Sequence, residues 1–185
     1  MRTPEQLKKI LDRREKKNAP LIHASLEMEV STHFPVLLDI MKKSTGKIIE
    51  LGGGLFSTPL LHWFNFESGR EIITYESYKH YYDFEKMFET KDHKVIFVKD
   101  FKDIKVEEHY GLVFIDHSVP KRRHTRGDDA LRFKDSADFI VLHDAGVNPN
   151  PKYGYTEIYP HFKYVYHWDK VYPHTTVCSN RFKFK

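Results

Sequence analysis

Two helices are predicted in the first part of the chain from the spacing of its apolar residues. The first begins near Thr3 and Pro4, and its narrow apolar stripe is typical of a helix on the outside of a domain. The second is capped by Thr32 and ends at Gly46. Its apolar face repeats at three- and four-residue spacing through Phe34, Leu37, Leu38 and Met41.

From Lys47 onward, short apolar runs alternate with segments of helical length. The runs that predict strands are Ile48 to Leu51, Ile72 to Tyr75, Val95 to Val98, Leu112 to Ile115 and Phe139 to Leu142. Helices are predicted to start at Ser57, with Leu60, Leu61 and Phe64 as the core face, and after Ser77. Strands that alternate with helices form a mostly parallel sheet covered on both faces. We therefore expect an α/β fold, a three-layer α/β/α sandwich.

The end of the chain has a different pattern. Residues 163–168 and 175–179 have strand composition, and the short connection between them contains Pro173. This spacing predicts an antiparallel C-terminal strand pair that closes the sheet. We expect one globular unit in which residues 1–46 form an N-terminal helical cap and residues 47–185 form the sheet-containing domain.

Composition limits the class of protein. With 185 residues, the chain is long enough for one substantial core and too short for two ordinary domains with a cleft between them. No apolar run approaches the roughly 20 residues that span a bilayer, and the charged N-terminus lacks the apolar region of a signal peptide. The single cysteine excludes an intramolecular disulfide. We expect a cytoplasmic protein with no membrane partner. The net charge of +4 is compatible with an anionic small molecule or with nucleic acid.

A glycine turn is the sharpest chemical signal. Gly52, Gly53 and Gly54 lie between a predicted strand and a predicted helix, where glycines let the backbone approach a ligand and the helix start offers N–H donors. A nucleotide-like ligand is indicated, against the alternative of a simple tight turn. A phosphate-binding P-loop is excluded because Leu55 and Phe56 replace its lysine and hydroxyl residues, and Ser57 replaces the third glycine of a dinucleotide fingerprint.

The pattern Glu50-x-Gly52-x-Gly54, followed by Ser57 and Thr58, resembles the first motif of class I S-adenosylmethionine-dependent methyltransferases. The resemblance implies a Rossmann-like fold with S-adenosylmethionine as cofactor. It also implies that Glu50 lies near the cofactor's amino group and that the glycine turn, with Gly53 and Ser57, passes under its methionine and ribose. Many members carry a further glycine where this chain has Phe56 or Ser57.

Two further positions fit the same cofactor. Glu76 follows the second predicted strand, where a carboxylate can accept hydrogen bonds from both ribose hydroxyls. Asp100 and Phe101 follow the third strand, where the family reads the adenine amino group and covers the ring. The alternative for Asp100 is a solvated acid in the charged run from Lys99 to Lys105.

Four side chains are candidates for the reaction centre. Asp116 and His117 follow the fourth predicted strand, and His143 and Asp144 follow the fifth. Ligands of parallel sheets bind at the carboxyl ends of strands, so these groups are expected to converge. A histidine oriented by a carboxylate can act as a base, and the same donors can bind a divalent cation. Carboxylates at strand ends also close turns, so a structural role stays open.

The basic run from Lys121 to Arg126 can receive a phosphate, a carboxylate or a nucleic-acid backbone, or can be a solvated helix start. The leading hypothesis is a methyltransferase acting on a small-molecule or sugar-like acceptor. A nucleic-acid methyltransferase is second, because the fourth strand ends in Ile115-Asp116-His117-Ser118 rather than a base-methylation signature. A non-catalytic S-adenosylmethionine-binding protein is the third alternative. The oligomeric state is not indicated.

Overall fold

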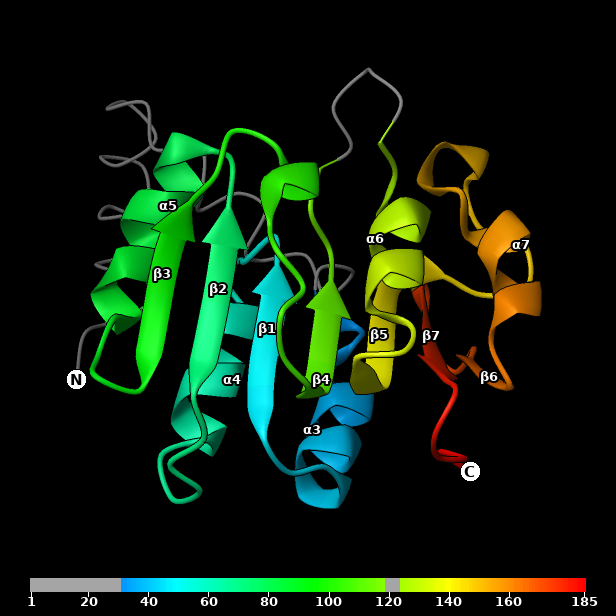
Figure 1. The fold of residues 1–185 in the computed structure, drawn as a ribbon, viewed down its shortest axis with the longest axis horizontal. Helices are drawn as coiled ribbons and strands as arrows, with labels where there is room; N and C mark the ends of the chain where they lie inside the picture. The colour runs from blue at the N-terminus through cyan, green and yellow to red at the C-terminus, as the bar shows by residue number, and fades with distance from the viewer. Residues whose placement is uncertain (1–30, 119–123) are drawn as a thin grey trace, which may run out of the picture.

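The computed structural model describes residues 31–118 and 124–185, which form one seven-stranded sheet with the order β3-β2-β1-β4-β5-β7-β6 (Figure 1). The strands are β1 (Lys47–Leu51), β2 (Ile72–Glu76), β3 (His93–Phe97), β4 (Tyr110–Ile115), β5 (Ala137–Ala145), β6 (Tyr164–Trp168) and β7 (His174–Ser179). The first five strands pair in parallel, whereas β7 runs antiparallel to both β5 and β6. The predicted α/β class, the mostly parallel sheet and the antiparallel C-terminal strand pair are confirmed.

Helices cover both faces of the sheet. The helices are α3 (Phe34–Lys43), α4 (Ser57–Phe64), α5 (Lys79–Glu85), α6 (Arg126–Phe133) and α7 (Tyr155–Ile158), with 3-10 turns η2 (Lys86–Phe88), η3 (Phe101–Asp103), η4 (Pro151–Tyr153) and η5 (Tyr159–His161). Residues of α3 and α4 pack with Ile48 and Phe114 on one face, and residues of α6 and α7 pack with Ile49 and Ile115 on the other. In Figure 1, α6 and α7 lie in front of the sheet.

The central strands are apolar because both of their faces are covered. Every residue of β4 is buried, and neighbouring side chains of β1 enter opposite cores, Ile48 on the α3 side and Ile49 on the α6 side. A strand enclosed in this way reads as a continuous apolar run rather than as an alternating pattern. This explains why the sequence identified β1 and β4 directly.

Only part of the predicted N-terminal helical cap, residues 1–46, lies within the described residues. The first predicted helix lies outside the described residues, whereas α3 is an integral layer of the sandwich with Leu37 and Ile40 fully buried. The sequence predicted that Thr32 caps this helix, but Thr32 is not the N-cap residue of α3. The N-cap residue is His33, which makes no side-chain capping bond, and the Thr32 hydroxyl bonds instead to His143 in β5 and to the carbonyl of Pro173 just before β7.

Helix α4 begins at Ser57 as expected, but its predicted core face is only partly correct. Leu61 is fully buried and Leu60 packs against the core, whereas Phe64 is 37% exposed. Phe64 is the last residue of the helix and joins Phe34 and Trp63 along a shallow apolar groove on the surface. Among the helices of the described ranges, none has the length and apolar character needed to cross a membrane.

Candidate functional site

The glycine turn leaves β1 at the carboxyl edge of the sheet. Gly52 has a φ of 80°, and a Cβ there would stand 2.2 Å from the Cα of His117, so glycine is required by both conformation and space. A Cβ on Gly53 would meet the carboxylate of Glu85. A Cβ on Gly54 would have the Ser57 Oγ at 3.8 Å as its nearest neighbour. Gly52 and Gly53 therefore allow the turn to pack closely against its neighbours, whereas Gly54 borders open space.

A cavity of about 140 Å³ lies over this turn. Its lining combines residues from the ends of β1, β2 and β4 with the start of α3: His33, Gly53, Gly54, Leu55, Phe56, Ser57, Glu76, Tyr78, Tyr81, Asp116, His117 and Ser118. Glu76 is almost fully buried, and its Oε1 accepts hydrogen bonds from the N–H groups of Ser77 and Tyr78. These two bonds fix the carboxylate at the cavity wall, as a ribose ligand requires.

Two further acids lie beneath the turn rather than in the cavity. Glu50 is fully buried, and its Oε2 accepts hydrogen bonds from Thr58 (2.8 Å) and Thr74 (2.7 Å). Glu85 is also fully buried, and neither of its carboxylate oxygens has a hydrogen-bond partner. Burial raises the pKa of Glu50 to about 7 and that of Glu85 to about 9. Neither Glu50 nor Gly52 lines the cavity, so their cofactor contacts stay predictions.

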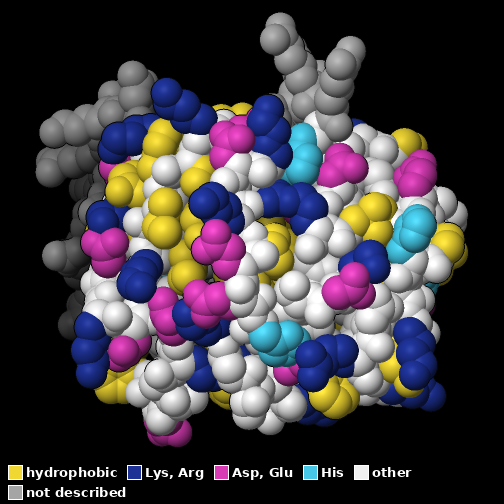
Figure 2. Space-filling model, viewed as in Figure 1, with side chains coloured by type: hydrophobic (Ala, Val, Ile, Leu, Met, Phe, Trp, Pro, Cys, Tyr) yellow, Lys and Arg dark blue, Asp and Glu magenta, His cyan; other side chains and the backbone are white. Residues whose placement is uncertain are grey.

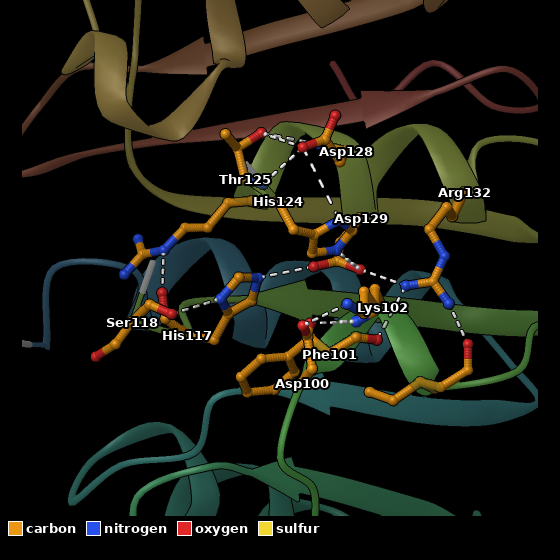
Figure 3. A network of polar contacts seen from close by, with 12 residues as sticks. Asp100, Phe101, Lys102, His117, Ser118, His124, Thr125, Asp128, Asp129 and Arg132 are labelled. Atoms are coloured by element: carbon orange, nitrogen blue, oxygen red, sulfur yellow. Dashed lines mark hydrogen bonds and ion pairs between the residues drawn. The ribbon is translucent and has the colours of Figure 1, made fainter. Parts of the chain in front are cut away.

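The residues predicted to contact adenine have other contacts in the structure, and their cofactor contacts stay predictions. Figure 3 shows Phe101 packed against His117, and the two rings stack at 4.2 Å, so the imidazole covers one face of Phe101. Asp100 accepts a hydrogen bond from the Lys102 N–H and forms an ion pair with its side chain. Neither Asp100 nor Phe101 lines the cavity. Tyr78, from the loop after β2, does line it and is 48% exposed.

His117 is held by its neighbours. Its Nδ1 bonds to the Ser118 carbonyl at 3.0 Å, and its Nε2 bonds to Asp129 at 2.9 Å (Figure 3). Asp129 is fully buried and also pairs with His124 and Arg132. Both ring nitrogens are therefore engaged in fixing the loop after β4, although the ring lines the cavity. The predicted catalytic role of His117 stays a prediction, and its contacts describe a positioning residue.

Arg126 joins the ends of β4 and β5. Its guanidinium is 6% exposed and pairs with Asp116 at 3.0 Å and Asp144 at 3.1 Å. It also donates hydrogen bonds to the backbone carbonyls of Asp116, His117 and His143. The Tyr153 hydroxyl donates to the same Asp144 oxygen, and Asp144 has a φ of 54°, a strained conformation for a residue with a side chain. The basic run therefore contributes a buried structural cation.

The Asp116 and His143 side chains meet, as the sequence predicted. Their Oδ2 and Nδ1 atoms are 3.1 Å apart. The other nitrogen of His143 lies 3.1 Å from the Thr32 Oγ1, which donates its own proton to the Pro173 carbonyl at 2.6 Å. His33 packs edge-on against His143 with ring centroids 4.7 Å apart, and neither of its ring nitrogens has a hydrogen-bond partner. Burial lowers the pKa of His33 to about 3, so its imidazole is neutral.

A second, larger cavity of about 430 Å³ lies beyond Asp144. Its lining mixes carboxylate, amide, amine and aromatic groups: Asp144, Ala145, Val147, Asn148, Pro149, Asn150, Lys152, Tyr153, Asp169, Tyr172, Pro173 and His174. Tyr172 is 72% exposed, so its ring is available at the rim. Part of the aromatic C-terminal region thus lines a cavity, while Tyr155 is fully buried and bonds to the His143 carbonyl.

Two residues of the site, His33 and Glu85, were missed by the sequence analysis, and a third, Arg126, was named only as part of the basic run. His33 and Glu85 carry no local pattern that separates them from ordinary helix residues. Arg126 had a usable signal, because Thr125 and Asp128 have capping-box spacing and form that box in the structure. Because Thr125 is the N-cap, α6 begins at Arg126, and this residue belongs to the helix rather than to the loop before it.

Comparison of the amino-acid sequence with known proteins finds no match. No protein-family model matches the chain, and no curated protein matches it. Comparison with solved structures does find similar folds.

Cofactor-bound Rv0187 from MTB aligns with a TM-score of 0.59 and 14% identity over 98% of this chain and 100% of that one. A putative O-methyltransferase from Klebsiella pneumoniae aligns with a TM-score of 0.55 and 14% identity over 80% and 79% of the two chains. The N-terminal domain of human METTL16 in complex with SAH aligns with a TM-score of 0.51 and 12% identity over 81% and 68%. The chain therefore has the Rossmann-like fold of class I S-adenosylmethionine-dependent methyltransferases.

Proposed function

We propose that this chain, which has the class I methyltransferase fold, is an S-adenosylmethionine-dependent methyltransferase acting on the hydroxyl group of a small-molecule or sugar-like acceptor. The observation that carries the proposal is the cavity at the carboxyl ends of β1, β2 and β4, where the glycine turn and Glu76 face one space. Ligands of open parallel sheets bind at this edge. The fold and the glycine turn support the cofactor, and the neighbouring cavity supports the acceptor class.

The residues at the cavity fit the cofactor's polar groups. The floor is open above Gly54, so a ligand can approach the backbone closely. Glu76 provides a fixed carboxylate for two ribose hydroxyls, and Tyr78 provides an exposed aromatic surface at the rim. When bound, S-adenosylmethionine supplies an electrophilic methyl group on its sulfonium sulfur.

Asp116 is the carboxylate placed to meet the acceptor. Transfer to a hydroxyl breaks the S–C bond, forms a C–O bond and releases the hydroxyl proton, which Asp116 can accept at the cavity wall. Although burial opposes ionisation, His143 and Arg126 hold the pKa of Asp116 below its ordinary value. Asp116 is therefore ionised and a weak base, and its Oδ2 lies 3.1 Å from the Nδ1 of His143.

The larger cavity is the proposed acceptor site. This cavity adjoins the proposed reaction centre through Asp144. Its lining offers hydrogen-bond acceptors, the carboxylates of Asp144 and Asp169, and a hydrogen-bond donor, the amine of Lys152. The exposed ring of Tyr172 offers a flat apolar surface. Such a mixture suits a polyhydroxylated compound better than a purely apolar one, because each hydroxyl needs a partner when it leaves water.

The proposed function is tested by calorimetric titration of the protein with S-adenosylhomocysteine. We expect binding to the unaltered chain and at least a tenfold loss of affinity in Glu76→Ala, because a hydrogen bond to a charged group is worth about 1.5–3 kcal/mol. Glu67→Ala is the matched control, since Glu67 is exposed in the loop between α4 and the amino end of β2, whereas Glu76 lies at the carboxyl end of that strand. No detectable binding to a folded, unaltered chain would contradict the proposal.

Within residues 31–118 and 124–185, the nucleic-acid alternative gains no specific support. It depended on the positive net charge and on the basic run, in which Arg126 is buried in ion pairs and residues 121–123 lie outside the described ranges. On the face covered by α6 and α7, Figure 2 shows basic and acidic side chains interspersed rather than gathered by sign. The non-catalytic alternative predicts S-adenosylhomocysteine binding without methyl transfer to any hydroxyl compound. A cytoplasmic location stays a prediction.

A further inference from the structure

We propose that His33, Asp116 and His143 form a binding site for a divalent transition-metal cation at the wall of the cofactor cavity. The three residues come from the start of α3, the loop after β4 and the strand β5. Each offers one ligand atom, and these atoms lie within 4.8 Å of one another. The role of the metal toward an acceptor rests on the proposed function, whereas the binding of the metal does not.

The tautomer of His143 provides the first argument. The Thr32 hydroxyl donates its single proton to the Pro173 carbonyl, so it can only accept from the Nε2 of His143. A neutral His143 then carries its lone pair on Nδ1. This lone pair faces the Asp116 Oδ2 at 3.1 Å, and two acceptors at that distance repel unless a cation lies between them.

His33 provides the second argument. Its side chain is 1% exposed, and both ring nitrogens lack a hydrogen-bond partner, which is costly for a buried polar group. A proton on Nδ1 of His143 would remove the repulsion between this atom and the Asp116 Oδ2. It would still leave both ring nitrogens of His33 without a hydrogen-bond partner. A metal ion replaces that proton and also gives one nitrogen of His33 a partner.

The surrounding charges and contacts suit a divalent cation. Asp116 uses Oδ1 for Arg126 and keeps Oδ2 on the His143 side, and Arg126 is also balanced by Asp144. The two carboxylates and one guanidinium leave a net negative charge before any metal binds. The Thr32 contact fixes the orientation of His143, as hydrogen-bonded partners of metal-binding histidines usually do.

The donor set indicates which metals are preferred. Two neutral imidazoles and one carboxylate favour zinc, iron, cobalt or nickel over magnesium, which prefers oxygen ligands. Three protein ligands leave coordination positions open, as in catalytic sites. His33 and Asp116 both line the cavity, so an open position faces the space where an acceptor hydroxyl would lie. A hydroxyl bound to the metal would lose its proton more easily than a free hydroxyl, so no strong base would be needed.

The experiment is calorimetric titration of chelator-treated, full-length protein with ZnCl₂ and, separately, MgCl₂. We expect one tight zinc site per chain that His33→Gln weakens at least tenfold, and no comparable response to magnesium. His161→Gln is the matched control, because His161 is exposed in η5, and it should leave zinc binding unchanged. Substitution with Co²⁺ should give visible absorption bands that His33→Gln alters.

S-adenosylhomocysteine affinity and thermal unfolding of His33→Gln are measured in parallel, so that misfolding is not mistaken for loss of a ligand. Equal zinc affinity in His33→Gln and in the unaltered chain would overturn the metal site, as would the absence of zinc binding to the unaltered chain. Failure of the metal site with S-adenosylhomocysteine binding intact would leave the proposed function standing. Zinc binding without any S-adenosylhomocysteine binding would overturn the proposed function alone.

Discussion

Arg126→Met is expected to lower the free energy of unfolding by about 3–5 kcal/mol, the usual cost of removing one partner from a buried ion pair. The substitution leaves the partly buried carboxylates of Asp116 and Asp144 without their cation and removes hydrogen bonds to three backbone carbonyls. Methionine fills much of the space of the arginine stem, so the loss reports charge and hydrogen bonding more than packing. Urea denaturation followed by tryptophan fluorescence measures it.

Arg181→Met is the control for this substitution. Arg181 also pairs with an aspartate, Asp138, at 3.3 Å, but its side chain is 49% exposed. Exposed pairs contribute at most about 1 kcal/mol because solvent screens them. A loss below 1 kcal/mol in Arg126→Met would show that the buried cation does not hold the two strand ends together.

The stability of the unaltered chain is expected to fall between pH 7 and pH 9, and Glu85→Gln should reduce that slope by up to about 1.4 kcal/mol per pH unit. Burial raises the pKa of Glu85 from 4.5 to about 9, with Glu50 and Glu76 adding to the shift. The folded state thus keeps a proton that the unfolded state releases above its own pKa. Stability is therefore highest below the unfolded pKa and declines as the pH rises towards the folded one.

Other buried groups also contribute to the pH dependence. Although burial opposes it, Asp116 raises the pKa of His143, and burial raises the pKa of Cys178, so each adds a slope of the same sign, above the ordinary histidine value of 6.5 for His143 and near the ordinary thiol value of 9.0 for Cys178. Glu50 contributes a slope of the same sign that ends near its pKa of about 7. The pKa values of His33 and His93 are lowered by burial, so their effects end near the ordinary histidine value of 6.5. Urea denaturation at pH 7, 8 and 9 measures the slope. Glu89→Gln is the control, because this exposed carboxylate has a lowered pKa and is ionised throughout the window. An unchanged slope in Glu85→Gln would refute the assignment.

The sheet was predictable because its central strands are apolar on both faces and are separated by helices. The same pattern placed Glu76, Asp116 and His143 at one edge, since the carboxyl ends of parallel strands coincide. The sequence could not show that Glu50 would lie under the glycine turn or that His117 would cover Phe101. Those outcomes depend on which threonine or carboxylate packs against each side chain, and such contacts join residues distant in the chain.

His33 illustrates the limit most clearly. In the sequence it stands beside a predicted helix cap and is one of twelve histidines. Its significance arises only when α3 packs against β4 and β5 and brings its ring within 4.7 Å of the His143 centroid. Arg126 differs, since the capping box formed by Thr125 and Asp128 already marks it as the first residue of a helix. Local sequence signals thus show which residue begins a helix, but they do not show which charged groups that residue will contact in the fold.

The Thr32 hydroxyl spans most of the chain, touching His143 and the carbonyl of Pro173, which lies 141 residues further on. During synthesis the ribosome releases Thr32 and His143 well before Pro173. Until the hairpin that carries Pro173 inserts β7 beside β5, the hydroxyl has no carbonyl to receive its proton, and the tautomer of His143 is not dictated. The proposed reaction centre is therefore complete only when β7 pairs with β5, and a chain without the C-terminal hairpin would have the glycine turn but not the contact that orients His143.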